Sequence, residues 1–117
     1  MESFGGRSGG DNPAAICEDL AAHDVRAPLW WSVVDGTVPV PSGAVPVVVG
    51  SQEWVEALRT SRVIVTNDHL PSWFSKREGQ HLLQTWHGTP IKKLLHDAPK
   101  AVTLRYRRLM DRQVPQW

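Results

Sequence analysis

Residues 45–66, VPVVVGSQEWVEALRTSRVIVT, decide the fold class of this chain. Val45 to Val49 and Arg62 to Thr66 are short runs rich in β-branched residues, and such runs predict buried strands. Between them, Ser51 is placed to cap a helix of about ten residues that ends at Thr60. A strand, a helix and a second strand in this order predict two parallel strands joined by a crossover helix.

The same alternation extends to both sides of this segment. Residues 29–34 and 80–86 predict two further strands. Helices are predicted after Asn12, which can act as an N-cap before Pro13, and again after Thr89. Short strands that alternate with helices predict an α/β fold with a largely parallel sheet.

The composition excludes several classes of function. The hydrophobic fraction of 41% is that of a globular domain, and the formal net charge of +1 gives no global field that would attract nucleic acid. Cys17 is the only cysteine, so neither an intrachain disulfide nor a CxxC metal site is possible. No apolar run reaches the roughly 18–20 residues that span a bilayer, and the first residues lack the features of a secretion signal. We expect one small domain, no metal site and no nucleic-acid partner.

The strongest chemical signal is the stretch QTWHGTP, residues 84–90. A predicted strand ends there and a helix begins, and ligands of open α/β sheets bind at the carboxyl ends of strands. Free N–H groups at a helix N-terminus attract phosphate, Gly88 allows a close approach, and Thr89 can cap the helix. His87 then lies where an anionic substrate would bind, and as a neutral imidazole it could act as a general base. The alternative is a structural histidine bonded to the backbone.

A second candidate site is the glycine-rich stretch GGRSGGDNP, residues 5–13. Its backbone N–H groups could form an anion-binding nest, and we count Gly6, Asp11 and Asn12 among the candidate substrate-binding residues. The stretch has neither GxGxxG spacing nor the Lys-Ser/Thr pair of a P-loop. A flexible loop followed by a helix cap is therefore the alternative.

Basic residues gather near the end of the chain, interleaved with leucine and valine. A solvated helix face is the usual meaning of such a segment. The functional alternative is binding to an anionic membrane surface or to a polyanionic substrate. The basic residues are Lys92, Lys93, Lys100, Arg105, Arg107, Arg108 and Arg112.

Three apolar residues are predicted to lie in the core. Trp54 and Trp73 are expected to point inward, since core packing is the commonest role of tryptophan at such positions. Cys17, at helical spacing from two alanines, is expected to be a small core residue.

These segments, in this order, resemble the CDP-glycerol glycerophosphotransferases, which build bacterial teichoic acid. The resemblance begins with ESF (2–4), a glycine-rich turn and DNP (11–13), and continues with VIVTN (63–67). It is most specific in QTWHGTPIKKL (84–94).

The resemblance implies a GT-B fold of two Rossmann-like halves, of which this chain would be the truncated N-terminal half. Members of the family transfer glycerol phosphate from CDP-glycerol to a poly(glycerol phosphate) chain and release CMP, and some relatives transfer ribitol phosphate. They act at the cytoplasmic face of the membrane, as peripheral proteins, on a lipid-linked acceptor. The histidine that matches His87 is catalytic in the family, where it is proposed to activate the acceptor hydroxyl. We therefore expect His87 to be catalytic, Gly88, Thr89 and Lys92 to bind substrate, and no cofactor to be needed besides the donor.

The family domain has an apolar strand before residues 2–4 and continues well beyond Trp117. We therefore expect residues 1–117 to form a single incomplete domain without the second GT-B half, and to be inactive alone. A sheet that lacks its first strand would bury less apolar area and expose its edges. The alternative function is a non-catalytic module that binds anionic membrane or polyanions through residues 92–112, with affinity that falls as salt rises.

Overall fold

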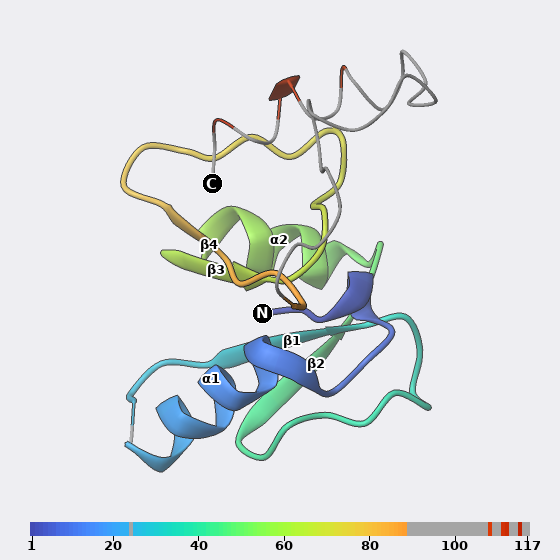
Figure 1. The fold of residues 1–117 in the computed structure, drawn as a ribbon, viewed down its shortest axis with the longest axis vertical. Coiled ribbons are helices and arrows are strands. Elements are labelled where there is room, and N and C mark those ends of the chain that lie inside the picture. Colours follow the sequence, from blue (N-terminus) through green and yellow to red (C-terminus); the bar gives the residue numbers. More distant parts are fainter. Residues whose placement is uncertain (24, 89–107, 109–110, 113–114, 116–117) are drawn as a thin grey trace.

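The protein is described by a computed structural model, which covers residues 1–23, 25–88, 108, 111–112 and 115. Within these residues, four strands form two parallel pairs, β1 with β2 and β3 with β4 (Figure 1). The elements in chain order are the 3-10 turn η1 (Phe4–Gly6), α1 (Asp11–Ala22), β1 (Leu29–Val33), β2 (Ala44–Val48), α2 (Gln52–Thr60), β3 (Val63–Thr66) and β4 (His81–Gln84). The predicted α/β fold with parallel strands is confirmed. No helix in these residues is long and apolar enough to cross a membrane.

Residues 1–3 connect the two pairs of strands. The carbonyl of Met1 accepts a hydrogen bond from Ser32 N on β1 (2.9 Å), and Glu2 N donates to Val65 O on β3 (3.0 Å). Figure 1 shows the N-terminus between the two pairs. The spatial order is therefore β2, β1, residues 1–3, β3, β4. If residues 1–3 are counted as the first extended segment of the chain, this order reads 3-2-1-4-5, which is the order of a Rossmann-type sheet.

Helix α2 forms as its sequence predicts. The Ser51 hydroxyl caps the helix by accepting from Trp54 N at 3.1 Å. Trp54 and Leu58 form the buried face, and the indole Nε1 of Trp54 donates to Ser32 Oγ at 3.0 Å. This last bond joins α2 to β1, so the helix is held against the sheet by a specific contact as well as by apolar packing.

The carboxyl end of α2 is bonded by two side chains from the loop between β3 and β4. Gln80 Nε2 donates to Leu58 O and to Ser61 O, both at 2.8 Å. Arg77 donates from Nε to Arg59 O at 2.8 Å, and from Nη2 to a second carbonyl at 2.9 Å. These bonds satisfy carbonyls that a helix leaves without partners, and they fix the loop just before β4 begins.

Two apolar clusters lie in the fold. One contains Trp54 and the other contains Cys17, so these two predicted core residues are confirmed. The prediction for Trp73 is wrong, since this residue is 49% exposed and only meets Trp54 edge-on at 5.8 Å between ring centroids. A hydrogen-bonded turn from Pro71 to Phe74 explains the difference, because it places Phe74 rather than Trp73 in the core.

The start of α1 differs from its prediction. The helix begins at Asp11, directly after Gly10, and the Asn12 side chain makes no capping bond. Asn12 N bonds instead to Asp11 Oδ1 at 2.7 Å, with Asp11 in the left-handed region at φ 68°. Because Asp and Asn tolerate this backbone region better than other residues with side chains, the helix can begin two residues earlier than predicted.

Asn67, the residue after β3, joins three segments. Its Oδ1 accepts from Phe4 N at 2.8 Å, while its Nδ2 donates to Ser3 Oγ and to Asp11 Oδ2, both at 3.1 Å. Asn67 is 2% exposed, so none of these bonds is exchanged for water at low cost. The amide therefore ties residues 1–3, the central segment of the sheet, and the start of α1 to the end of β3.

Glu2 is a buried carboxylic acid on the central segment. Only 4% of the residue is exposed, and its Oε1 accepts from Thr66 Oγ1 at 2.9 Å. Burial raises the pKa of Glu2 above its ordinary value of 4.5, and the hydrogen bond from Thr66 opposes this only in part.

We expect Glu2→Gln to flatten the pH dependence of folding and to stabilise the protein at neutral pH. A raised pKa means that the folded state binds more protons than the unfolded state above pH 4.5, so the free energy of unfolding falls as pH rises through the folded pKa. Glutamine cannot ionise, and its amide oxygen can still accept from Thr66. Thermal unfolding between about pH 4 and about pH 8 measures the effect. Parallel Tm curves for the two proteins would contradict it.

We expect Asn67→Asp to destabilise the fold by about 2 kcal/mol, because the new carboxylate has no proton to donate and faces the carboxylate of Asp11. Asp11→Asn in the same chain reverses donor and acceptor and should recover most of this loss. Asparagine also tolerates the left-handed backbone at position 11. Chemical unfolding of the two single variants and the double variant gives the coupling energy. Additive effects of the two changes would show that the bond between them does not matter.

Candidate functional site

The candidate site lies at the carboxyl ends of the strands. The segments that follow residues 1–3, β3 and β4 are Phe4–Gly6, residues 67–69 and residues 85–88, and the start of α1 reaches the same edge. Strand order reverses between residues 1–3 and β3, and open α/β sheets bind ligands at such a switch point. The QTWHGTP and glycine-rich stretches, which are far apart in the sequence, thus meet at the edge where a ligand is expected.

His87 is exposed at this edge and contacts Phe4. The two ring centroids are 5.3 Å apart, with an angle of 41° between the planes. Phe4 is itself held by its backbone N–H on Asn67. The imidazole is therefore placed against the end of the central segment, while its exposure leaves it accessible to a substrate.

Asn12 holds the backbone just before His87. Its Nδ2 donates to Trp86 O at 3.1 Å and to Thr85 O at 3.5 Å. Trp86 N in turn donates to Gln84 Oε1 at 3.0 Å. This placement assigns Asn12 a role in positioning the loop. Its predicted contact with substrate stays a prediction, as does that of Asp11, which is exposed beside it.

Within the part of the chain that the structure describes, three residues other than glycine have a left-handed backbone, and all three lie at this edge. Their φ angles are 50° for Phe4, 68° for Asp11 and 55° for Trp86. Such conformations cost about 1 kcal/mol or more each and persist only where surrounding bonds enforce them. Asn67 and Asn12 supply those bonds, and strain of this kind is concentrated at functional sites.

The two glycines predicted to bind substrate have different surroundings. Gly6 is buried, and a Cβ there would lie 2.8 Å from Val49 Cγ2 and 3.3 Å from Ser32 O on β1, so glycine is needed for the turn to pack against the ends of β1 and β2. Its N–H already donates to Ser3 O at 3.1 Å. Gly88 is exposed with φ 147°, and no atom of the described residues lies within 4 Å of a Cβ placed there, which agrees with the close approach expected. Contact of either glycine with a substrate stays a prediction.

Some predicted residues lie outside the described part of the chain. These are Thr89 and Lys92, the helix expected after Thr89, and most of the basic segment 92–112. Their predicted roles remain predictions. Within the described residues, no group of three or more His, Cys, Asp or Glu side chains could hold a metal ion.

Phe4 and Asn67 are two residues of this edge that were not predicted from the sequence as site residues. Asn67 had a signal, because it is the first polar residue after a buried strand and thus belongs at the ligand-binding edge. Phe4 had none, since its contact with His87 depends on residues 1–3 lying between β1 and β3.

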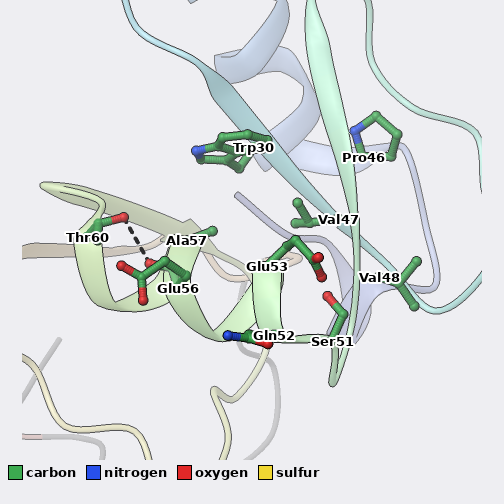
Figure 2. Close-up of a pocket in the computed structure, with 10 residues that line it drawn as sticks. All are labelled: Trp30, Pro46, Val47, Val48, Ser51, Gln52, Glu53, Glu56, Ala57 and Thr60. Atoms are coloured by element: carbon green, nitrogen blue, oxygen red, sulfur yellow. Dashed lines mark hydrogen bonds between the residues drawn. The ribbon is translucent and has the colours of Figure 1, made fainter.

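A separate groove lies between β2 and α2 (Figure 2). Its volume is about 740 Å³, and Figure 2 shows Trp30 and Val47 on one side and Glu53 and Glu56 on the helix opposite. None of the residues predicted for the site lines it. The described residues that the sequence predicts for the site therefore lie at the carboxyl-end loops and not in this groove.

Comparisons with known proteins identify the family of the chain. All 117 residues match the family described as CDP-Glycerol:Poly(glycerophosphate) glycerophosphotransferase. The teichoic acid poly(glycerol phosphate) polymerase of Staphylococcus epidermidis is 34% identical over the whole chain, which spans 17% of that protein. The teichoic acid glycerol-phosphate transferase of Staphylococcus aureus is 38% identical over 80% of the chain, which spans 24% of it.

The fold is also found in solved structures. A variant of the wall teichoic acid polymerase TagF superposes on 99% of the chain with a TM-score of 0.89 and 32% identity, and the chain covers 30% of it. TagF soaked with CDPG gives a TM-score of 0.88 at 31% identity. The sequence match covers the chain from end to end, and the fold agrees with that of a GT-B-like transferase. The chain therefore belongs to the CDP-glycerol:poly(glycerophosphate) glycerophosphotransferase family.

Proposed function

We propose that this chain supplies the general base of a transferase that moves glycerol phosphate, or a related polyol phosphate, from CDP-glycerol to the end of a poly(glycerol phosphate) chain. The observation that carries the proposal is the position of His87. Its ring is exposed at the switch-point edge and rests against Phe4, and Asn12 holds the preceding loop.

In the proposed reaction, His87 removes the proton from the terminal hydroxyl of the acceptor. The oxygen then attacks the phosphorus atom that carries glycerol in CDP-glycerol. The bond from this phosphorus to the phosphate oxygen of CMP breaks, and CMP leaves with that oxygen. Phosphoryl transfer depends on positioning and on stabilising the developing charge, so a loop held by hydrogen bonds at a strained backbone suits it.

The substrates follow from the relatives. TagF structures with CDPG support CDP-glycerol as the donor. The named relatives are a teichoic acid poly(glycerol phosphate) polymerase and a teichoic acid glycerol-phosphate transferase. We propose a lipid-linked acceptor, a peripheral location on the anionic cytoplasmic face of the membrane, and no cofactor besides the donor. Because the chain spans 17% to 30% of these relatives, we expect the groups that complete the site to lie in the other part of such an enzyme.

We expect the 117-residue chain alone to release no CMP from CDP-glycerol. A chimera of the S. epidermidis polymerase that carries this chain in place of its matching segment should release CMP when a lipid-linked glycerol phosphate acceptor is present.

His87→Ala in the chimera should lower kcat by about 10²–10⁴-fold, the usual contribution of a general base. The matched control is His81→Gln, because His81 is exposed at the opposite end of β4. Normal turnover by the His87→Ala chimera would sink the proposal.

We expect Asn12→Ala to lower kcat by about tenfold, since the loop before His87 loses two hydrogen bonds. A raised KM in the same variant would show that Asn12 also contacts the substrate, as the sequence predicts. In NMR spectra of the chain, the His87 ring signals should shift as the imidazole leaves the face of Phe4. Asp19→Ala, an exposed change on the same helix, is the control. An unchanged His87 signal together with full kcat would show that Asn12 does not position the loop.

A further inference from the structure

We propose that Arg7 binds a phosphate group of the glycerol phosphate substrates beside His87, an inference that rests on the proposed function. Arg7 directly follows the turn η1 at the carboxyl end of the central segment, and its side chain is exposed. It therefore lies at the edge of the sheet where the switch point is located.

The guanidinium is held in place by the turn itself. Arg7 Nη1 donates to Phe4 O at 3.2 Å. A Cβ on Gly5 would lie 3.1 Å from the same nitrogen, a tight contact that would push the guanidinium aside by a few tenths of an ångström. Gly5 also has φ 61°, where glycine is favoured. Glycine at this position therefore serves both the turn and the placement of Arg7.

Phe4 links the guanidinium to the proposed base. Its carbonyl oxygen accepts from Arg7, and its ring contacts the ring of His87. A cation and an imidazole thus flank one residue, whose backbone is fixed in turn by Asn67. A phosphate bound by Arg7 would be next to the group that takes the proton.

Among the described residues the charge of Arg7 is not paired, although the Asp68 carboxylate is near, with its Oδ2 3.8 Å from the position that a Cβ on Gly5 would take. Within the described residues, the ion pair between His23 and Asp19 is the only one closer than 4.0 Å, so no carboxylate in that part of the chain pairs with Arg7. Arg77 shows the contrast, since its Nε and both Nη atoms donate to backbone carbonyls. A guanidinium has five N–H donors in a fork that matches phosphate oxygens, and Arg7 uses one nitrogen on Phe4.

Two phosphates could provide the ligand, one at the end of the acceptor and one in CDP-glycerol. Both are phosphate anions that a guanidinium recognises through charge-assisted hydrogen bonds. NMR titrations of the ¹⁵N-labelled chain with glycerol 3-phosphate and, separately, with CDP-glycerol distinguish them. We expect signals of Arg7 and His87 to shift with at least one ligand.

Arg7→Gln should raise the Kd for that ligand by about tenfold, the loss of one charge-assisted bond, and Arg7→Lys should have a smaller effect. The matched control is Arg26→Gln, because Arg26 is exposed just before β1, at the opposite end of the strands. If the Kd for both ligands is the same in Arg7→Gln and in the unchanged chain, the inference is overturned.

The chimera provides a second measurement. If the isolated chain binds neither ligand, the KM values of the chimera decide the question. Arg7→Gln should raise KM for the acceptor or for CDP-glycerol by about tenfold and change kcat less. Unchanged KM values for both substrates would overturn the inference while leaving the role of His87 intact. Conversely, full turnover by His87→Ala together with a raised KM in Arg7→Gln would reject the proposed base and support Arg7.

Discussion

The hydrogen bonds of Asn67 are the constraint on which the rest of the site depends. One buried amide bonds to the backbone of Phe4 and to the side chains of Ser3 and Asp11. These partners belong to the central segment and to the start of α1, so a single side chain at the end of β3 aligns two other elements. An amide suits this position because it donates and accepts at the same time, and a buried polar group must do both to avoid a cost.

The strained residues of the site become understandable from this constraint. Phe4 and Asp11 have a left-handed backbone, and both bond to Asn67. Trp86 is strained as well, and Asn12, the residue after Asp11, holds its carbonyl. The unfavourable conformations are therefore maintained by a connected set of hydrogen bonds, and this set determines where the imidazole of His87 lies relative to Phe4.

In this fold, the helices and strands support the site, and the loops carry its polar groups. Helix α2 is anchored at one end by Ser51 and at the other by Arg77 and Gln80, which also fix the loop that leads into β4. The apolar clusters hold the helices against the strands, while the carboxyl-end loops present exposed polar groups. Functional groups on loops above a rigid sheet are typical of α/β enzymes, and TagF has the same arrangement of its backbone over this region.

The sequence by itself determined the elements whose signals are local. Helix α2 follows from a capping serine and a helical spacing of apolar residues, and β3 follows from a short run of β-branched residues. The QTWHGTP stretch likewise indicated His87, because a strand that is followed at once by Gly and a helix-capping Thr predicts an anion-binding site. These features depend on neighbours a few residues apart, so they can be recognised without the fold.

Only the tertiary structure decided the contacts between distant segments. Residues 1–3 have no strand signal of their own, yet they lie between β1 and β3 because their backbone groups find partners on both sides. That placement brings Phe4 to His87, and it leaves Asn12 bonding to Trp86 instead of capping its helix. In the loop after β3, the turn from Pro71 to Phe74 buries Phe74 and leaves Trp73 exposed. Local propensity cannot show such choices, since each depends on which donors, acceptors and apolar surfaces the folded chain brings within reach.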